Sequence, residues 1–338
     1  MVEKICIKEY TTRSGRSYRD FALSYEVFGR PLGNAPIVLV NHALTGNSTV
    51  SGASGWWKEL IGSEKCVDTN VFSVLAFNVP GNGYDDFLIE NYLDFSIYDI
   101  AKLFLIGVGT LQIDTLFAVI GGSLGGSIAW QMAVLDPNLI ENIIPIATDW
   151  KATDWLLAQC RIQKELLEHS DRPVMSARMH AMTFYRSPQS FTQKFGRTVH
   201  KNLGVFNVES WLRHHGEKLQ QRFQQKAYML MNHLLMTNDI TMGHNNIQET
   251  VKLIKGNIFL IGINTDWFYV NEEIKKTYTQ LKEVKENVYY SQIDSMHGHD
   301  AFLIEYDQLS KILKDTFSVK NIQRNNYEYT NVIGYSHI

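Results

Sequence analysis

The chain has 338 residues, of which 45% are hydrophobic and 20% are charged, a composition typical of an ordinary globular protein. Its formal net charge is -3 and no block of lysine or arginine stands out, so the charge pattern gives no indication of nucleic-acid binding. Three widely spaced cysteines, the lack of a signal-peptide pattern and the lack of a long apolar run indicate no disulfide framework, no metal cluster and no membrane span, so we expect a cytoplasmic protein.

The first half of the chain alternates between two patterns. Stretches that resemble helices, at 96–109 and 126–136, separate short apolar runs rich in β-branched and aromatic residues. These runs lie at 19–28, 36–41, 71–78, 115–121 and 142–147. Apolar strands alternating with helices predict a parallel sheet that is buried on both faces. The polar breaks RSGRS and RPLGNA resemble hairpin turns, which leaves antiparallel pairing open for the first runs.

The character of the sequence changes between residues 150 and 250. Strand-like runs disappear there, and long stretches with helical spacing of apolar residues replace them, such as WLLAQCRIQKELLEH. The alternation then resumes with a strand at 257–263, a helix near 271–284, a strand at 287–293 and a helix at 301–317. We therefore predict an α/β core over 1–150 and 251–320, a helical insertion over 151–250 and a polar C-terminal tail over 321–338.

A glycine-rich turn follows the apolar run LFAVIG. The sequence Gly121-Gly122-Ser123-Leu124-Gly125 matches G-x-S-x-G, and a helix-like stretch comes directly after it. This pattern occurs by chance in roughly one chain in ten of this length, so a plain glycine-rich turn is the alternative. The strand before it and the helix after it are the context of a nucleophile elbow, in which a strained serine projects its hydroxyl above the sheet.

A serine hydroxyl needs a base, and the base needs an acid that orients it. In chains with such an elbow, the acid and then the histidine follow the serine in the sequence. Asp266 comes just after the apolar run NIFLIGI, and His297 and His299 come just after NVYYSQI. The alternative for Asp266 is a loop or helix-capping aspartate, and position alone does not choose between the two histidines.

The early run PIVLVN is followed by the loop HALTGNST. A loop in this position supplies the second backbone donor of an oxyanion hole, next to the N–H of the residue that follows the nucleophile. We expect Leu44 and Leu124 to provide these two donors. The alternative for this segment is an ordinary surface loop, since loops are also rich in Thr, Gly and Asn.

Several blocks, in this order, make the chain similar to one family. The blocks NHALTG, GWWKELIG, FNVPGNGY, GGSLGG, SARMHAMTFYRS, FNVESWLRHHGEKLQQRF and GHDAFL resemble those of the homoserine O-acetyltransferases, which belong to the α/β-hydrolase superfamily. The resemblance runs from about residue 20 to residue 315. It implies an α/β-hydrolase fold with a helical lid, and it is more specific than an elbow alone, which many hydrolases share.

The resemblance also implies roles for particular residues. Ser123 would be the nucleophile, Asp266 the orienting acid, and His299, the histidine of GHDAFL, the base. Arg178 and Asp300 would hold the carboxylate and the ammonium of an amino-acid substrate, and Tyr185 would line the same tunnel. Without the resemblance, Arg178 would be interpreted as half of a surface ion pair.

The implied reaction is transfer of an acetyl group from acetyl-CoA to L-homoserine in methionine biosynthesis, through an acyl-enzyme and without a metal or a bound prosthetic group. The resemblance also implies a homodimer formed by the helical insertion. The chain departs from the family pattern after FNVPG, where NGYDDFLIENYLDFS replaces a GSTGP-type segment, and again at DWFYV after the acid.

These departures keep other functions open. The alternatives are a serine esterase or thioesterase, transfer from succinyl-CoA and transfer to serine. A binding protein without catalytic activity is a further alternative, which Ser, Asp and His in the expected order argue against.

Overall fold

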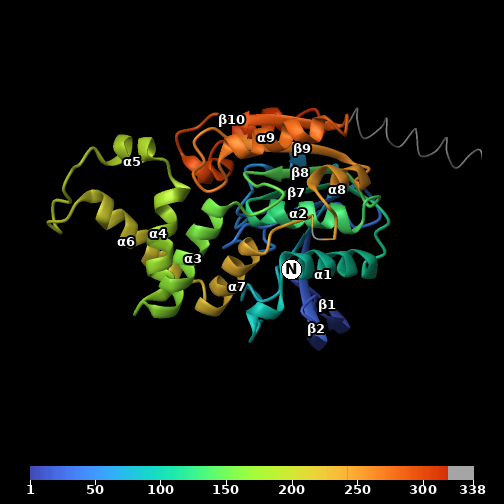
Figure 1. Cartoon of the computed structure of the whole chain (residues 1–338), viewed down its shortest axis with the longest axis horizontal. Coiled ribbons are helices and arrows are strands. Elements are labelled where there is room, and N and C mark those ends of the chain that lie inside the picture. The colour runs from blue at the N-terminus through green and yellow to red at the C-terminus, as the bar shows by residue number, and fades with distance from the viewer. Residues whose placement is uncertain (242, 319–338) are drawn as a thin grey trace, which may run out of the picture.

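A mostly parallel sheet of eight strands forms the centre of the computed structural model, which describes residues 1–241 and 243–318 (Figure 1). In spatial order the strands are β1 (Glu3–Thr11), β2 (Ser17–Gly29), β6 (Ser73–Phe77), β3 (Ile37–Asn41), β7 (Leu116–Gly122), β8 (Ile140–Ile146), β9 (Asn257–Ile263) and β10 (Val288–Ile293). Strand β2 pairs antiparallel with both β1 and β6, and the strands from β6 to β10 are parallel to one another. The predicted α/β fold is confirmed, and the early hairpin is antiparallel. The predicted tail at 321–338 lies outside the described residues.

Alternating side chains of the central strands build two hydrophobic cores, one on each face of the sheet. In β3, Leu39 belongs to one core and Val38 and Val40 to the other, and all three are fully buried. The first core is completed by side chains of α1 (Ile97–Thr110), α2 (Leu124–Leu135), α8 (Ile247–Leu253) and α9 (Asn271–Lys282). The second is completed by α10 (Tyr306–Leu313) and by the segment 50–72, which holds the two-residue strands β4 (Ile61–Gly62) and β5 (Val67–Asp68). Burial of both faces explains why the strand sequences are continuously apolar.

Six helices lie between β8 and β9 in the described part of the chain, and the first five form a group separate from α8. These five are α3 (Asp154–His169), α4 (Pro173–Tyr185), α5 (Pro188–Phe195), α6 (Asn207–Gln220) and α7 (Gln225–Met236). Figure 1 shows this group, hereafter the lid, at one side of the sheet, with α5 and α6 farthest from the strands. Helix α4 packs against α3, α6 and α7 and also against the 3-10 turn η2 (Gly298–Leu303). The lid therefore reaches the segment that carries the predicted histidine.

Three details differ from the sequence predictions. Strand β1 was not predicted, because most of its exposed residues are charged and its buried apolar residues, Ile5, Ile7 and Tyr10, do not keep a strict alternation. The helical spacing of apolar residues runs without interruption through residues 209–235 of the predicted insertion, whereas the structure divides this stretch into α6 and α7 at residues 221–224. The continuous helix predicted at 301–317 is wrong, because the chain first forms η2 and begins α10 only at Tyr306. Among the described residues, no helix is long and apolar enough to cross a membrane.

Candidate active site

The residues predicted to act together follow strands whose carboxyl ends share one edge of the sheet. Leu44 follows β3, Ser123 follows β7, and Asp266 follows β9; His42, which was not predicted as a site residue, also follows β3. His299 follows β10, within η2. In parallel α/β sheets this edge is where ligands bind, because loops from neighbouring strands converge there. The topology thus brings together residues that are up to 257 positions apart in the chain.

Ser123 joins β7 directly to α2 with a backbone φ of +55°, a strained value for a residue with a side chain. Glycines surround it because neighbouring backbone leaves no room for a Cβ. A Cβ at position 125 would lie 2.2 Å from the carbonyl oxygen of Asn41, and one at position 121 would lie 2.3 Å from the carbonyl carbon of Gly125. The serine N–H donates to the carbonyl of Ile146 at 2.8 Å. This is the geometry of a nucleophile elbow.

Asp266 and His299 form a buried, directed pair. The distance between Nδ1 of His299 and Oδ2 of Asp266 is 2.7 Å, and both side chains are 5% exposed or less. The other carboxylate oxygen, Oδ1, accepts the N–H groups of Phe268 and Tyr269 at 2.7 and 2.9 Å. The DWFYV segment, which departs from the family pattern, thus still supplies two backbone donors to the acid. Because Nδ1 donates to Asp266, Nε2 of His299 is left to act as a base.

Aromatic rings confine the His299 imidazole. The ring of Tyr185 lies 5.3 Å from it between centroids, that of Phe268 5.2 Å and that of Phe302 5.7 Å, and the ring of Tyr269 stacks on it at 5.9 Å. Phe302 also contacts the elbow, since a Cβ added at Gly122 would lie 2.4 Å from its ring. The histidine and the serine turn therefore both pack against Phe302.

The loop 42–46, hereafter the oxyanion loop, carries the expected donor Leu44 and is held by His42. Nε2 of His42 accepts the Val79 N–H at 2.9 Å, so Nδ1 bears the proton and donates to the Ala43 carbonyl at 2.8 Å. Burial lowers the pKa of His42 to about 4, which keeps the ring neutral and suited to accept and donate at once. Leu44 and Leu124 are both buried, and the loop runs beside the elbow because the Asn41 and His42 carbonyls face Gly125.

The residues expected to bind substrate lie between the lid and η2. Arg178 and Tyr185 are both on α4, with the guanidinium 5.6 Å from the tyrosine ring centroid. Asp300 is in η2, where burial raises the pKa of its carboxyl while Arg178, Arg186 and His299 oppose that rise. The structure also pairs Asp300 with Arg186 at 3.7 Å. Asp300 therefore already has a cationic neighbour.

Sequence reasoning missed some residues of this region. Arg186 stands next to Tyr185 in the block SARMHAMTFYRS, but nothing in that block predicts a partner 114 positions away. Tyr269 stacks on His299, and its hydroxyl lies 3.3 Å from that of Ser127 on α2. Arg222, between α6 and α7, donates to the Thr45 carbonyl of the oxyanion loop at 3.2 Å. No local pattern indicates any of these long-range contacts.

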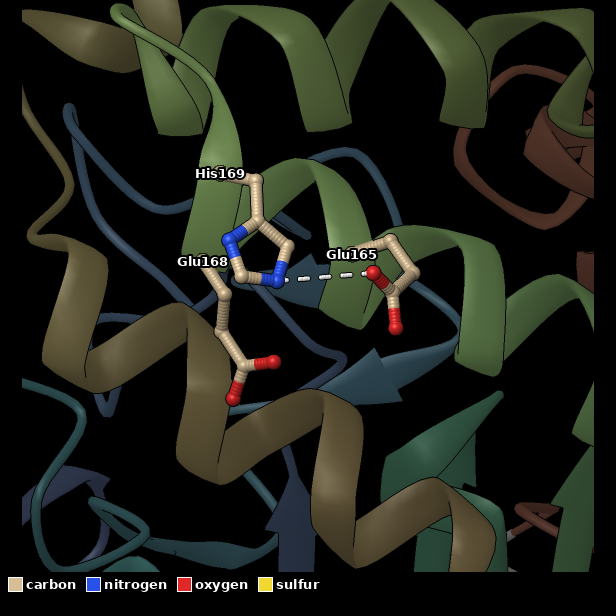
Figure 2. A group of neighbouring side chains, drawn as sticks. All are labelled: Glu165, Glu168 and His169. Carbon is tan, nitrogen blue, oxygen red and sulfur yellow. Dashed lines mark ion pairs between the residues drawn. The ribbon is translucent and has the colours of Figure 1, made fainter.

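A group of potential metal ligands occurs away from this edge. The described residues include one set of three side chains whose potential ligand atoms lie close together. It consists of Glu165, Glu168 and His169 on α3 (Figure 2). Each has an ion-pair partner on the same helix: His169 pairs with Glu165 at 3.5 Å, Glu165 also with Arg161, and Glu168 with Lys164 at 3.2 Å. We interpret the group as a solvated helix surface, since such pairs are common at i,i+4 spacing.

The comparisons with known proteins agree with this geometry. Residues 36–167 match the family model described as alpha/beta hydrolase fold. The homoserine O-acetyltransferase of Cyclobacterium marinum is 32% identical, covering 94% of this chain and 95% of its own, and that of Methanococcus vannielii is 30% identical, covering 94% and 73%. Among solved structures, homoserine O-acetyltransferase from Bacillus anthracis superposes with a TM-score of 0.85 at 20% identity, covering 94% of this chain and 97% of its own. Esterase E22 superposes with a TM-score of 0.84 at 18% identity, covering 94% and 100%.

Fold and site together define an α/β-hydrolase-fold enzyme with a nucleophile elbow. The similarity in sequence narrows this class further: the chain belongs to the homoserine O-acetyltransferase family. The solved structures, at 18–20% identity, show the fold alone.

The buried neutral His42 predicts a specific dependence of stability on pH. The unfolded chain takes up a proton at this histidine near pH 6.5, whereas the folded chain does so only near pH 4. The free energy of unfolding should therefore fall as the pH drops from 6.5 to 4, by on the order of 3 kcal/mol for this group. When urea denaturation is measured across this pH range, the free energy of unfolding of His42→Gln should fall less than that of the wild type.

A control variant separates this effect from general acid sensitivity. His244 is exposed, so His244→Gln should follow the wild-type curve. Parallel curves for wild type and His42→Gln would contradict the buried, neutral assignment.

Proposed function

We propose that this enzyme moves an acetyl group from acetyl-CoA to the hydroxyl of L-homoserine, as a step of methionine biosynthesis. The observation that carries the proposal is a strained elbow serine and a buried Asp266–His299 pair, with Arg178 of the lid and Asp300 of η2 nearby, in a member of this family. The serine and the pair suit acyl transfer in general. Arg178 and Asp300 suit an amino-acid acceptor.

The first half-reaction would form an acyl-enzyme. His299 takes the proton of Ser123 as Oγ attacks the thioester carbonyl, and the N–H groups of Leu44 and Leu124 stabilise the tetrahedral oxyanion. The C–S bond then breaks, and the thiol of CoA leaves with the proton from His299. Losing one oxyanion donor typically costs ~3 kcal/mol of barrier. Acetyl-CoA acts here as a co-substrate, and the proposal includes no bound cofactor or metal.

The second half-reaction would pass the acyl group to homoserine. His299 deprotonates the homoserine hydroxyl, which attacks the acyl carbonyl, and Ser123 recovers the proton as the ester is released. Arg178 would hold the carboxylate of the acceptor through a bidentate contact. Asp300 would bind the ammonium group of the acceptor while it also pairs with Arg186 at 3.7 Å. Tyr185, buried between Arg178 and His299, would line the path.

Transfer rather than hydrolysis requires that homoserine reach the acyl-enzyme before water does. A lid that covers the serine supports this by excluding solvent. Hydrolysis is the second candidate function, because the segment 82–96 departs from the family pattern and lies close to the oxyanion loop. Asn82 of this segment is 3.4 Å from Nε2 of His42. Succinyl-CoA as donor and serine as acceptor are the remaining alternatives.

The decisive experiment follows thiol release from acetyl-CoA with and without homoserine and identifies the product by mass. We expect fast release only with homoserine, yielding O-acetylhomoserine, and at least ~100-fold less with Ser123→Ala because the nucleophile is gone. Equal release without homoserine would make water the acceptor. Release from succinyl-CoA alone would change the donor, and undiminished turnover by Ser123→Ala would contradict the acyl-enzyme.

Substitutions of the two acceptor residues should separate the half-reactions. We expect Arg178→Gln and Asp300→Asn each to raise the KM for homoserine by ~10-fold or more, because each removes a charged contact to the acceptor. The pre-steady-state burst of thiol that reports acylation should stay within ~3-fold of wild type. Arg172→Gln is the matched control, since Arg172 is an exposed lid arginine paired with Glu217. A lost burst with an unchanged KM would contradict the assignment.

We also propose that two copies of the chain associate through the lid. The segment between α5 and α6 exposes Val199 (54%), Leu203 (60%) and Phe206 (40%). A surface cavity of about 500 Å³ lies beside it, lined by aromatic residues such as Phe191 and Phe195. Clustered exposed apolar side chains on a projecting element mark an association surface, and Figure 1 shows α5 and α6 well away from the sheet.

Light scattering after size exclusion should therefore give twice the chain mass of 38.8 kDa. Leu203→Glu should shift the mass to that of one chain, because a buried unpaired charge opposes association. Leu253→Glu, at an exposed leucine on α8, is the control and should remain dimeric. A wild-type mass of one chain at working concentration would refute the proposal.

A further inference from the structure

The side chain of Arg222 connects the lid to the oxyanion loop by a hydrogen bond. Arg222 lies in the turn between α6 and α7, and its Nη1 donates to the carbonyl oxygen of Thr45 at 3.2 Å. Arg222 is exposed, and none of the ion pairs found among the described residues includes it. Its clearest described contact is therefore with the backbone of the loop that carries Leu44.

Two peptide planes connect this contact to the Leu44 N–H. The Thr45 carbonyl shares a planar peptide unit with the N–H of Gly46, and that N–H donates to the Ala43 carbonyl at 3.0 Å. The Ala43 carbonyl in turn shares a peptide unit with the N–H of Leu44. Carbonyl and N–H point in opposite directions across a trans peptide, so fixing the two carbonyls also fixes the direction of the Leu44 donor.

The turn between these two peptide units is tightly packed, so a shift of the Thr45 carbonyl would also shift the Ala43 carbonyl and the Leu44 N–H. A Cβ at Gly46 would lie 2.9 Å from Cβ of His42 and 3.3 Å from the Ala43 carbonyl oxygen. His42 holds the same Ala43 carbonyl from the core side at 2.8 Å. The oxyanion loop is thus anchored from the sheet by a buried imidazole and from the lid by a guanidinium.

We propose that Arg222 is a positioning residue through which the lid sets the direction of the Leu44 N–H in the oxyanion hole. This inference rests on the proposed acyl transfer, because it assigns the residue to that same site. It makes the alignment of the oxyanion hole depend on the lid, so that the hole is complete only while the lid is in place. Closure would then promote catalysis as well as exclude water.

The competing role is direct binding of an anionic donor. Arg178 is close enough to Arg222 to interact with it electrostatically, so a phosphate-bearing thioester could contact Arg222 in this cationic region. The hydrogen bond to Thr45 favours the positioning role, because this N–H group of Arg222 already donates to a backbone carbonyl. Donors with and without phosphate groups distinguish the two roles.

The test compares Arg222→Ala, Arg222→Lys and the control Arg172→Ala, which removes an exposed lid guanidinium paired with Glu217 instead. Two donors are used: acetyl-CoA, and p-nitrophenyl acetate, which has no phosphate. We expect Arg222→Ala to lower the acylation rate ~10-fold or more with both donors, with KM values within ~3-fold, since complete loss of an oxyanion donor costs 10²–10³. Arg222→Lys, which retains a donor, should restore part of the rate.

A tetrahedral adduct gives a readout that a merely structural role would not change. The affinity of a trifluoromethyl ketone for Ser123 should fall with Arg222→Ala by about the same factor as the rate, because both depend on the oxyanion donors. Unaltered rates with both donors would overturn the proposal, and so would a loss confined to acetyl-CoA. If acetyl-CoA is not a donor for the wild type, the proposed function fails, while the p-nitrophenyl acetate measurements still test Arg222.

Discussion

The structure depends on the close packing of the serine turn against the oxyanion loop. Ser123 holds a φ of +55° because β7 must pass into α2 with no intervening loop, and Gly125 lies where any side chain would collide with the Asn41 carbonyl. This contact places the first residues after β3 beside the first residues of α2. The expected nucleophile and both expected oxyanion donors are therefore positioned by backbone packing, which is stiffer than any arrangement of side chains alone.

The expected acid and the expected base are arranged on the same edge by different means. Asp266 is oriented by two backbone N–H groups of the following turn, and His299 is oriented by Asp266 and by the rings around it. Phe302 links this pair to the elbow by packing against Gly122. Aromatic packing around a buried imidazole restricts its rotamers, so the expected base is held in place by the fold itself.

The lid contributes arginine side chains to the region of the site that the sheet and its loops position. Arg178 on α4 lies over the ring of Tyr185, Arg186 at the end of the same helix pairs with Asp300, and Arg222 donates to the oxyanion loop. A cluster of cations in a partly buried region favours anionic groups such as the carboxylate of an amino acid. In our proposal the same helices exclude water, so acceptor binding and protection of the acyl-enzyme have a common structural origin.

Much of this protein was predictable from its sequence because the relevant signals are local. The apolar runs predicted seven strands of the main sheet, and Gly121, Gly122, Gly125 and Gly126 around Ser123 predicted the elbow. The placement of an acid and of histidines after the last two strands predicted that an acid and a histidine meet, because parallel strands share one carboxyl edge. The choice of His299 over His297 required the family resemblance.

The tertiary structure alone decided how these elements are completed. Strand β1 forms because a neighbouring strand pairs with it, η2 replaces a helix because Gly298 packs against the backbone of residues 185–187, and Asp300 pairs with Arg186 across 114 positions. The contact of Arg222 with Thr45 spans 177 positions. Such contacts join segments whose separation in the chain carries no pattern, so only the folded arrangement of sheet and lid brings them together.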